Sequence, residues 1–101
     1  MRRQVVIAFG VLALAACTGR PAPDATGVEI YQQLCVRCHG ADLGGAIGPA
    51  LGPGSEIEAE SDEFIRQTIH NGRGRMPSFA RTLTDEQIDR VISYLREVQG
   101  D

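Results

Sequence analysis

The stretch Cys35-Val36-Arg37-Cys38-His39 decides how the rest of this chain is interpreted. Two thiols three positions apart can add to the two vinyl groups of one porphyrin, while the imidazole of the next residue ligates its iron. This spacing is the attachment signature of a covalent c-type haem. We therefore expect one haem, bound through Cys35 and Cys38, with His39 as an iron ligand.

Three other kinds of site use the same residue types. A thioredoxin-like redox site would follow a strand in a βαβ unit, whereas a helix is expected before Cys35 and a glycine-rich loop after His39. A structural zinc site needs about four ligands, and beyond this motif the folded part offers only His70. A plain disulfide gives no reason for the adjacent histidine, so haem attachment is the interpretation that uses all three residues.

The first sixteen residues have the pattern of a signal peptide. Two arginines precede an apolar and glycine run over residues 5–14, which is too short to span a bilayer as a stable helix. The following Leu14-Ala15-Ala16-Cys17 resembles the bacterial lipobox, in which a peptidase cuts before a cysteine that carries diacylglycerol. We expect Cys17 to be lipidated; the alternative is an ordinary secretory signal that leaves Cys17 as a free thiol.

The mature part of the chain is long enough for one small domain. Residues 17–26 are small, polar and proline-bearing, which predicts a flexible tether between the lipid and a domain at residues 27–101. A domain of this size often needs a metal, a disulfide or a cofactor for stability. A covalently bound porphyrin would supply part of the missing core.

The charge of the chain limits its partners. All ten basic residues are Arg, and the part after residue 16 keeps eight of them against thirteen Asp and Glu. A negative domain is not expected to bind nucleic acid. Docking through a ring of lysines is also excluded.

Hydrophobic periodicity and capping residues predict three helices and thus an all-α domain. The first follows Gly27, and its last turn carries the attachment cysteines. Ser61 can cap the second helix, and Gly72 can end it in a left-handed cap. The apolar positions expected on these two helices are Val28, Tyr31, Leu34, Cys35, Phe64, Ile65, Thr68 and Ile69.

The third helix has the clearest start. Thr84 is followed three residues later by Gln87, which makes a capping box, and Leu83 and Ile88 occupy the two positions of a hydrophobic staple. The rest of its apolar stripe is Val91, Ile92, Leu95 and Val98, with Tyr94 on the flank.

Two long loops connect the helices. Residues 40–54 contain six glycines and two prolines, which excludes a regular element. Loops of this length are expected only where something such as a cofactor organises them. The apolar residues that indicate such contacts in the first loop are Leu43, Ile47, Ala50 and Leu51.

The second loop, residues 73–82, contains the candidate for the other iron ligand. Pro77 lacks a backbone donor and restrains Met76 to an extended conformation, which suits the presentation of sulfur to iron. A methionine that fills a gap in the core is the alternative. His70 is the second candidate ligand, although a histidine at a helix end can simply favour the helix dipole.

Together these motifs resemble class I c-type cytochromes over residues 27–99. Besides the attachment motif, the matching segments are Gly48-Pro49, Met76-Pro77 and Tyr94-Leu95. The resemblance implies a small cytochrome c fold, with three main helices and long loops packed around one covalent haem. It also implies that the carbonyl of Pro49 accepts a hydrogen bond from the imidazole of His39.

The same resemblance places Gly27 and Tyr31 where the first helix crosses the last one, near Val91 and Tyr94. Residues that contact the haem propionates do not transfer from the family. Arg73 and Arg75 are candidates because a bidentate guanidinium suits a carboxylate.

The ligand pair implied by the resemblance favours electron transfer over catalysis. Axial His39 and Met76 would leave no open position on the iron, and a methionine ligand raises the reduction potential. We expect a monomeric one-electron carrier, lipid-anchored at the periplasmic side of a Gram-negative membrane, inner or outer, that serves a membrane-bound dehydrogenase or terminal oxidase. The alternatives are a haem enzyme with a weak or open distal site and an electron-entry subunit of a larger oxidoreductase.

Overall fold

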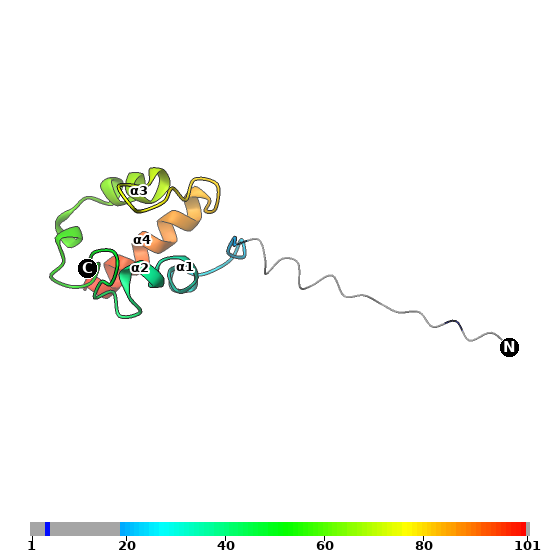
Figure 1. Ribbon diagram of the computed structural model, residues 1–101, viewed down its shortest axis with the longest axis horizontal. Helices are drawn as coiled ribbons and strands as arrows, with labels where there is room; N and C mark the ends of the chain where they lie inside the picture. Colours follow the sequence, from blue (N-terminus) through cyan, green and yellow to red (C-terminus); the bar gives the residue numbers. More distant parts are fainter. Residues whose placement is uncertain (1–3, 5–18, 101) are drawn as a thin grey trace.

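The computed structural model describes residue 4 and residues 19–100, so the predicted signal peptide and Cys17 lie outside the described residues (Figure 1). The elements in chain order are α1 (Gly27–Leu34), α2 (Val36–His39), the 3-10 helix η3 (Glu56–Ala59), α3 (Asp62–Asn71) and α4 (Asp85–Gln99). Within the described part, the only extended pairing is one isolated bridge between Arg73 and Met76. The predicted all-α class is confirmed. Among these same residues, no helix combines the length and apolar character needed to cross a membrane.

The N-termini of the helices follow their sequence signals. Thr84 and Gln87 form the predicted capping box of α4, and the hydroxyl of Ser61 accepts a hydrogen bond from the backbone of Phe64 in α3. A second capping box, between Thr26 and Glu29, starts α1 and was not part of the sequence prediction. The five backbone donors satisfied by side chains at these starts explain why the helices begin where they do.

The C-terminus of α3 differs from the expected left-handed cap. Gly72 has a φ of 77° and a ψ of 168°, which lies outside the left-handed helical region. A Cβ at this position would meet the carbonyl oxygen of Met76 at 2.7 Å and backbone atoms of Pro77 and Ser78 at 2.8 Å. Gly72 is therefore needed because the chain after α3 turns back onto it.

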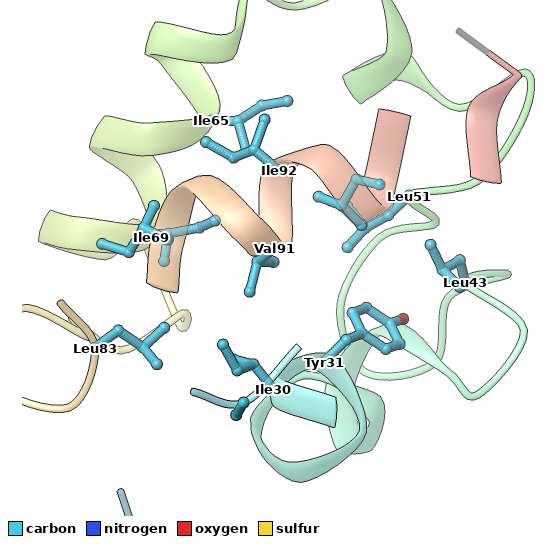
Figure 2. Packing of buried hydrophobic residues seen from close by; sticks show 12 residues of the cluster. Ile30, Tyr31, Leu43, Leu51, Ile65, Ile69, Leu83, Val91 and Ile92 are labelled. Atoms are coloured by element: carbon cyan, nitrogen blue, oxygen red, sulfur yellow. The ribbon is translucent and has the colours of Figure 1, made fainter. Parts of the chain in front are cut away.

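The core lies where α4 is covered by α1 on one side and by α3 on the other (Figures 1 and 2). On α1, Tyr31 is buried and Leu34 is partly buried against the core, as predicted, and so is Cys35 directly after the helix. Val28 is 37% exposed, contrary to the prediction, and Ile30, which the prediction omitted, is fully buried. Helices α3 and α4 bury the residues that their periodicity predicted, with Phe64, Thr68 and Val98 at the edges. The buried apolar residues are Ala25, Ile30, Tyr31, Leu43, Leu51, Ile65, Ile69, Leu83, Ile88, Val91, Ile92 and Leu95.

The crossing of α1 and α4 is close because it contains a glycine. A Cβ on Gly27 would lie 2.1 Å from the carbonyl oxygen of Arg90 and 3.0 Å from Cβ of Tyr94. A few residues further along α1, the rings of Tyr31 and Tyr94 pack with their centroids 5.5 Å apart. The crossing implied by the family resemblance is thus present.

Residues 21–26, which we call the N-terminal strap, lie against α4. Gln87 donates from Nε2 to the carbonyl of Ala22 at 3.1 Å. Arg90 donates to the carbonyls of Pro23, at 3.0 Å, and Ala25. The side chain of Ala25 is buried. The predicted flexible tether is therefore wrong for residues 21–26, which belong to the folded body.

The glycine-rich loop is irregular, as predicted, but it is fixed at several points. Leu43 and Leu51 are buried, and the backbone N–H of Leu51 donates to the carbonyl of Leu43 at 2.8 Å. Gln99 of α4 donates to the carbonyl of Leu51 at 2.8 Å. Ile47, in contrast, is 72% exposed, so it does not contribute to the buried core.

Candidate haem site

His39 is the best-defined side chain of the site. It ends α2, is only 8% exposed, and its Nδ1 lies 2.8 Å from the carbonyl oxygen of Pro49. Because a carbonyl can only accept, Nδ1 must carry the proton and donate, and the lone pair is left on Nε2. This tautomer is the one that a metal-binding imidazole needs, with its ring orientation fixed by the second nitrogen.

The backbone around His39 closes over its ring. Gly48 lies so near that a Cβ there would be 3.1 Å from Cε1 of His39. The backbone N–H of Gly48 donates to the carbonyl of Cys38 at 2.7 Å, and that of Gly45 donates to the carbonyl of His39 at 2.8 Å. The hydroxyl of Tyr31 donates to the carbonyl of Gly40 at 2.6 Å and holds the start of the loop. The glycine-rich loop therefore positions the imidazole.

The two attachment cysteines lie beside this histidine in the chain, Cys35 at the break between α1 and α2 and Cys38 within α2. Cys35 separates the two helices, so the single first helix predicted from the sequence is divided at this residue. Both thiols are free and partly buried. Burial, and secondarily the proximity of Cys38, raises the pKa of the Cys35 thiol to about 11. The Cys35 thiol is thus mainly protonated at neutral pH.

The other interpretations of the motif find no counterpart in the structure. Helix α1, not a strand, precedes Cys35, which excludes a thioredoxin-like βαβ context. Over residue 4 and residues 19–100, no group of three or more His, Cys, Asp or Glu side chains is arranged to hold a metal ion.

Met76 lies in a loop that is pinned to the end of α3. Its backbone pairs with that of Arg73 through hydrogen bonds of 2.9 and 3.0 Å. Further along, the N–H of Phe79 donates to the carbonyl of Ile69 at 3.0 Å, and the hydroxyl of Ser78 donates to the carbonyl of His70 at 2.6 Å. The side chains of Met76 and Phe79 are partly buried against the core.

The remaining predicted site residues are placed less specifically. Nδ1 of His70 lies 2.8 Å from the side-chain oxygen of its neighbour Asn71. Arg73 and Arg75 are exposed, and the guanidinium of Arg73 stacks over the ring of Phe64, 5.3 Å from its centroid. No contact in the structure directs either arginine toward a propionate, so that role stays a prediction.

Sequence reasoning missed two residues that shape the site. Phe79, like Met76, is partly buried against the core, and the hydroxyl of Tyr31 anchors the loop after His39. The signal for Phe79 was an aromatic residue in an otherwise polar segment. Tyr31 was expected at the helix crossing, but no local pattern predicts a hydrogen bond to a residue nine positions away.

The residues present fit a covalently attached haem. They provide two free thiols, a buried imidazole with Nε2 available, and a loop backbone packed so closely that a Cβ at Gly48 would press on the imidazole. The thiols would form the thioether links to the porphyrin, and the imidazole nitrogen is a protein ligand of haem iron.

Comparisons with known proteins agree with this fit. The family model described as "Cytochrome C oxidase, cbb3-type, subunit III" matches residues 22–95. The chain is 44% identical to cytochrome c-551 of Bacillus subtilis over 73 residues, which cover 71% of this chain and 60% of that protein. It is 30% identical over 92 residues to the cytochrome c subunit of 4-cresol dehydrogenase from Pseudomonas putida, covering 90% of this chain and 76% of that protein.

Comparison with solved structures also finds c-type cytochromes. The solved structure of the KustC0563 c-type cytochrome superimposes with a TM-score of 0.67 at 26% identity, and the match covers 74% of this chain and 99% of that one. The matches cover between 18% and 94% of the length of the curated relatives, and 60% of cytochrome c-551. The attachment motif, the histidine fixed by a proline carbonyl, the three main helices and these relatives show that the chain belongs to the small monohaem class I c-type cytochromes, a family of electron carriers whose cofactor is c-type haem.

Proposed function

We propose that this protein is a one-electron carrier whose haem is bound covalently by Cys35 and Cys38 and ligated axially by His39 and Met76. The observation that carries the proposal is the contact between Nδ1 of His39 and the carbonyl of Pro49, because it leaves Nε2 as the only ring nitrogen able to bind iron. When bound, the haem supplies an iron that gains and loses single electrons.

Met76 is the proposed second axial ligand. Its support is positional: the side chain is partly buried, and the backbone on both sides is held by hydrogen bonds to Arg73 and to the end of α3. A thioether on a fixed backbone can stay at one distance from a metal in both oxidation states. Small changes of structure between the two states favour fast electron transfer.

The proposed ligands would limit the chemistry at the iron. With both His39 and Met76 bound to it, the iron would have no open position for oxygen or peroxide. His39 is oriented by Pro49 and packed by Gly48, which prevents the ring from leaving the metal. These residues hold ligands, and none of them has to move a proton.

The place of the protein in the cell is also part of the proposal. Bacterial relatives of this kind are typically membrane-associated and act outside the cytoplasm, and we propose lipidation at Cys17 and a periplasmic location. Names of relatives include an oxidase subunit and a dehydrogenase subunit, which supports a membrane-bound dehydrogenase or a terminal oxidase as partner.

The lipid anchor is tested by labelling with radioactive palmitate, which should mark the wild type but not Cys17→Ala. Equal labelling of both would refute the anchor.

The ligand assignment is tested by absorption spectroscopy of holoprotein from a host that attaches haem. The ferric wild type should show the near-infrared band of a methionine–iron bond. Met76→Ala should lose this band and lower the reduction potential, since sulfur favours ferrous iron. His70→Ala is the matched control and should retain both properties. Loss of the band in His70→Ala, or rapid binding of carbon monoxide by the reduced wild type, would contradict the proposal.

A further inference from the structure

Gln99, the last residue of α4, is a buried polar side chain that contacts the glycine-rich loop. Its exposed fraction is only 7%. Its Nε2 donates to the carbonyl of Leu51 at 2.8 Å, and its Oε1 accepts from Nη1 of Arg96 at 2.8 Å. Leu51 lies 48 positions earlier in the chain, and Figure 2 shows it beside α4. Burying an amide is costly unless it is hydrogen-bonded, so these two contacts are what allow an amide rather than an apolar side chain at this position.

The direction of the Gln99 amide is fixed by Arg96. A guanidinium can only donate, so the atom that it contacts must be the amide oxygen, and the NH₂ group must face Leu51. Arg96 is itself held, because its Nε donates to Asp62 at 2.8 Å and its Nη1 to the carbonyl of Glu58 at 3.1 Å. A cation bound to an amide oxygen also polarises the amide and strengthens its N–H groups as donors. Gln99 is therefore a donor of fixed direction.

The segment that Gln99 holds includes the carbonyl that orients His39. The carbonyl of Pro49 accepts from Nδ1 of His39 at 2.8 Å, and Leu51 is two residues further along. Within the part of the chain that the structure describes, His39 and Gln99 are the only side chains that make hydrogen bonds with residues 49–51. Pro49 has no backbone N–H that could fix it. The position of its carbonyl therefore depends on the residues that flank it.

Both flanks of Pro49 are held by hydrogen bonds. Before it, the N–H of Gly48 donates to the carbonyl of Cys38 at 2.7 Å. After it, the N–H of Leu51 donates to Leu43, in the same loop, at 2.8 Å, and the carbonyl of Leu51 accepts from Gln99. Among these bonds only the one from Gln99 comes from α4, the longest helix that the structure describes. Gln99 thus connects the segment after Pro49 to a rigid element.

We propose that Gln99 is a positioning residue of the haem site, which holds Leu51 so that the carbonyl of Pro49 stays within hydrogen-bonding reach of His39. The proposal rests on the function above, in which Nε2 of His39 ligates the iron. A partner on the second ring nitrogen orients a metal-bound imidazole and raises its basicity. A more basic ligand favours ferric iron, which carries one more positive charge than ferrous iron. Gln99 thus lowers the reduction potential by acting through His39.

A purely structural role is the other explanation of these contacts. Helix α4 ends at Gln99, and the bond to Leu51 could serve only to close the fold at this end. Loss of the amide would then lower the free energy of unfolding without altering the imidazole. The positioning role differs because it requires a change at Nδ1 of His39 that exceeds the change in global stability.

The first test is Gln99→Met, which keeps an unbranched side chain and removes both amide hydrogen bonds. The Nδ1 proton of His39 is observed by nuclear magnetic resonance in the ferrous holoprotein. Its exchange with solvent should accelerate about tenfold, the change expected when one hydrogen bond is lost. The reduction potential, measured by voltammetry, should rise, because the less firmly bound imidazole proton makes His39 a weaker donor to iron.

A second variant separates the bond to Leu51 from the contact with Arg96. Gln99→Glu retains an oxygen that can accept from Arg96, but a carboxylate cannot donate to the carbonyl of Leu51. Exchange of the His39 proton should again accelerate. The added negative charge itself favours ferric iron, so this variant is judged by proton exchange alone. Exchange at the wild-type rate would overturn the role of the bond to Leu51.

The matched control is the same substitution at an exposed glutamine. Gln67 lies on α3 and also makes two side-chain hydrogen bonds, with Glu63 and Asn71, both of 2.9 Å. In Gln67→Met the exchange rate of the His39 proton should stay within about twofold of the wild type, and the potential should be unchanged. Urea unfolding of each holoprotein gives its global stability. Exchange in Gln99→Met that only follows a loss of global stability, with an unchanged potential, would show a structural role and overturn the proposal.

The near-infrared band, recorded for every variant, separates this proposal from the ligand assignment on which it rests. Its absence from the wild type would refute ligation by Met76, while the Nδ1 proton of His39 would still decide the role of Gln99. With the band present, equal exchange rates and equal potentials in Gln99→Met and the wild type would refute the role of Gln99 alone.

Discussion

Position 72 requires glycine for two reasons, its backbone conformation and the lack of space for a side chain. Its φ of 77° and ψ of 168° are accessible essentially to glycine alone. The turn also brings the backbone of Met76, Pro77 and Ser78 within 2.8 Å of the place where a Cβ would stand. The residue that ends α3 therefore also determines where the loop that contains Met76 lies.

We expect Gly72→Ala to lower the free energy of unfolding by about 2–4 kcal/mol, from backbone strain and overpacking together. Gly54→Ala is the matched control. Gly54 has a φ of 79°, but nothing lies within 4 Å of a Cβ there, so only the backbone cost of about 1–2 kcal/mol remains. Urea unfolding of both holoproteins measures the difference. The near-infrared band should weaken only in Gly72→Ala, and an unchanged band would show that Met76 is positioned independently of Gly72.

At the scale of residues, the sequence predicted which residues are important better than it predicted the physical reason for each. The attachment motif and the capping residues Ser61 and Thr84 are local signals, and both caps were found as predicted. Gly72 was expected to end a helix, but the conformation expected for it was wrong. Its crowding depends on a loop that returns onto it, and no local pattern contains that information.

At the scale of elements, the N-terminal strap and α4 form one unit. Gln87 serves both, since its amide oxygen accepts from the backbone of Thr84 in the capping box while its nitrogen donates to Ala22. Arg90, one turn further along α4, binds two strap carbonyls. Composition alone predicted a tether here, because small residues and prolines are common in flexible linkers as well as in ordered segments such as this one. The contacts that order the strap join residues 65 to 67 positions apart, beyond the range of any periodicity.

Removing the guanidinium of Arg90 should release the strap. We expect Arg90→Ala to lower the free energy of unfolding by about 1–3 kcal/mol, because two carbonyl groups lose a charged donor. Hydrogen exchange at the backbone N–H of Ala25, which donates within the strap to Ala22 at 3.0 Å, should accelerate. Arg81→Ala, at an exposed arginine, is the control. Its free energy of unfolding should stay within about 0.5 kcal/mol of the wild type, and hydrogen exchange at Ala25 should be unchanged. Equal effects of the two substitutions would contradict a specific role for Arg90.

The capping box of α1 predicts a response to acid. Hydrogen bonds from the backbone and then the hydroxyl of Thr26 hold the pKa of the Glu29 carboxyl below its ordinary value of 4.5. A lowered folded-state pKa contributes stability that is present above pH 4.5 and is lost as the pH falls through the folded value. Glu29→Gln keeps a capping side chain but does not titrate. Its stability should therefore fall less steeply than that of the wild type below about pH 4.5, as measured by urea unfolding at several pH values; parallel curves would contradict this assignment.

At the scale of the whole molecule, the haem is expected to complete the core. The buried cluster joins α1, α3 and α4 and reaches the first loop only through Leu43 and Leu51 (Figure 2). Around it lie partly buried side chains of the site, among them Leu34, Cys35 and Met76. A small domain of this kind usually depends on its cofactor for stability.

The double variant Cys35→Ser and Cys38→Ser removes both attachment points and tests this dependence. Without haem, we expect near-ultraviolet circular dichroism to be lost and the unfolding transition in urea to become broad or absent. The wild-type holoprotein purified from the same host is the reference. A sharp transition in the haem-free variant, with stability within about 1 kcal/mol of the reference, would show that the helices alone form the core.

With the proposed lipid on Cys17, the strap would also limit how far the domain can move from the membrane. Only residues 18–20 separate Cys17 from the first strap residue, Pro21, and four peptide units reach at most about 14 Å. Such a short connecting segment would keep the domain next to the lipid headgroups. Its diffusion would then be confined to the plane of the membrane. Electron exchange would then depend on the density of neighbours in the same leaflet, and release of the strap by Arg90→Ala would widen the radius that the domain can search.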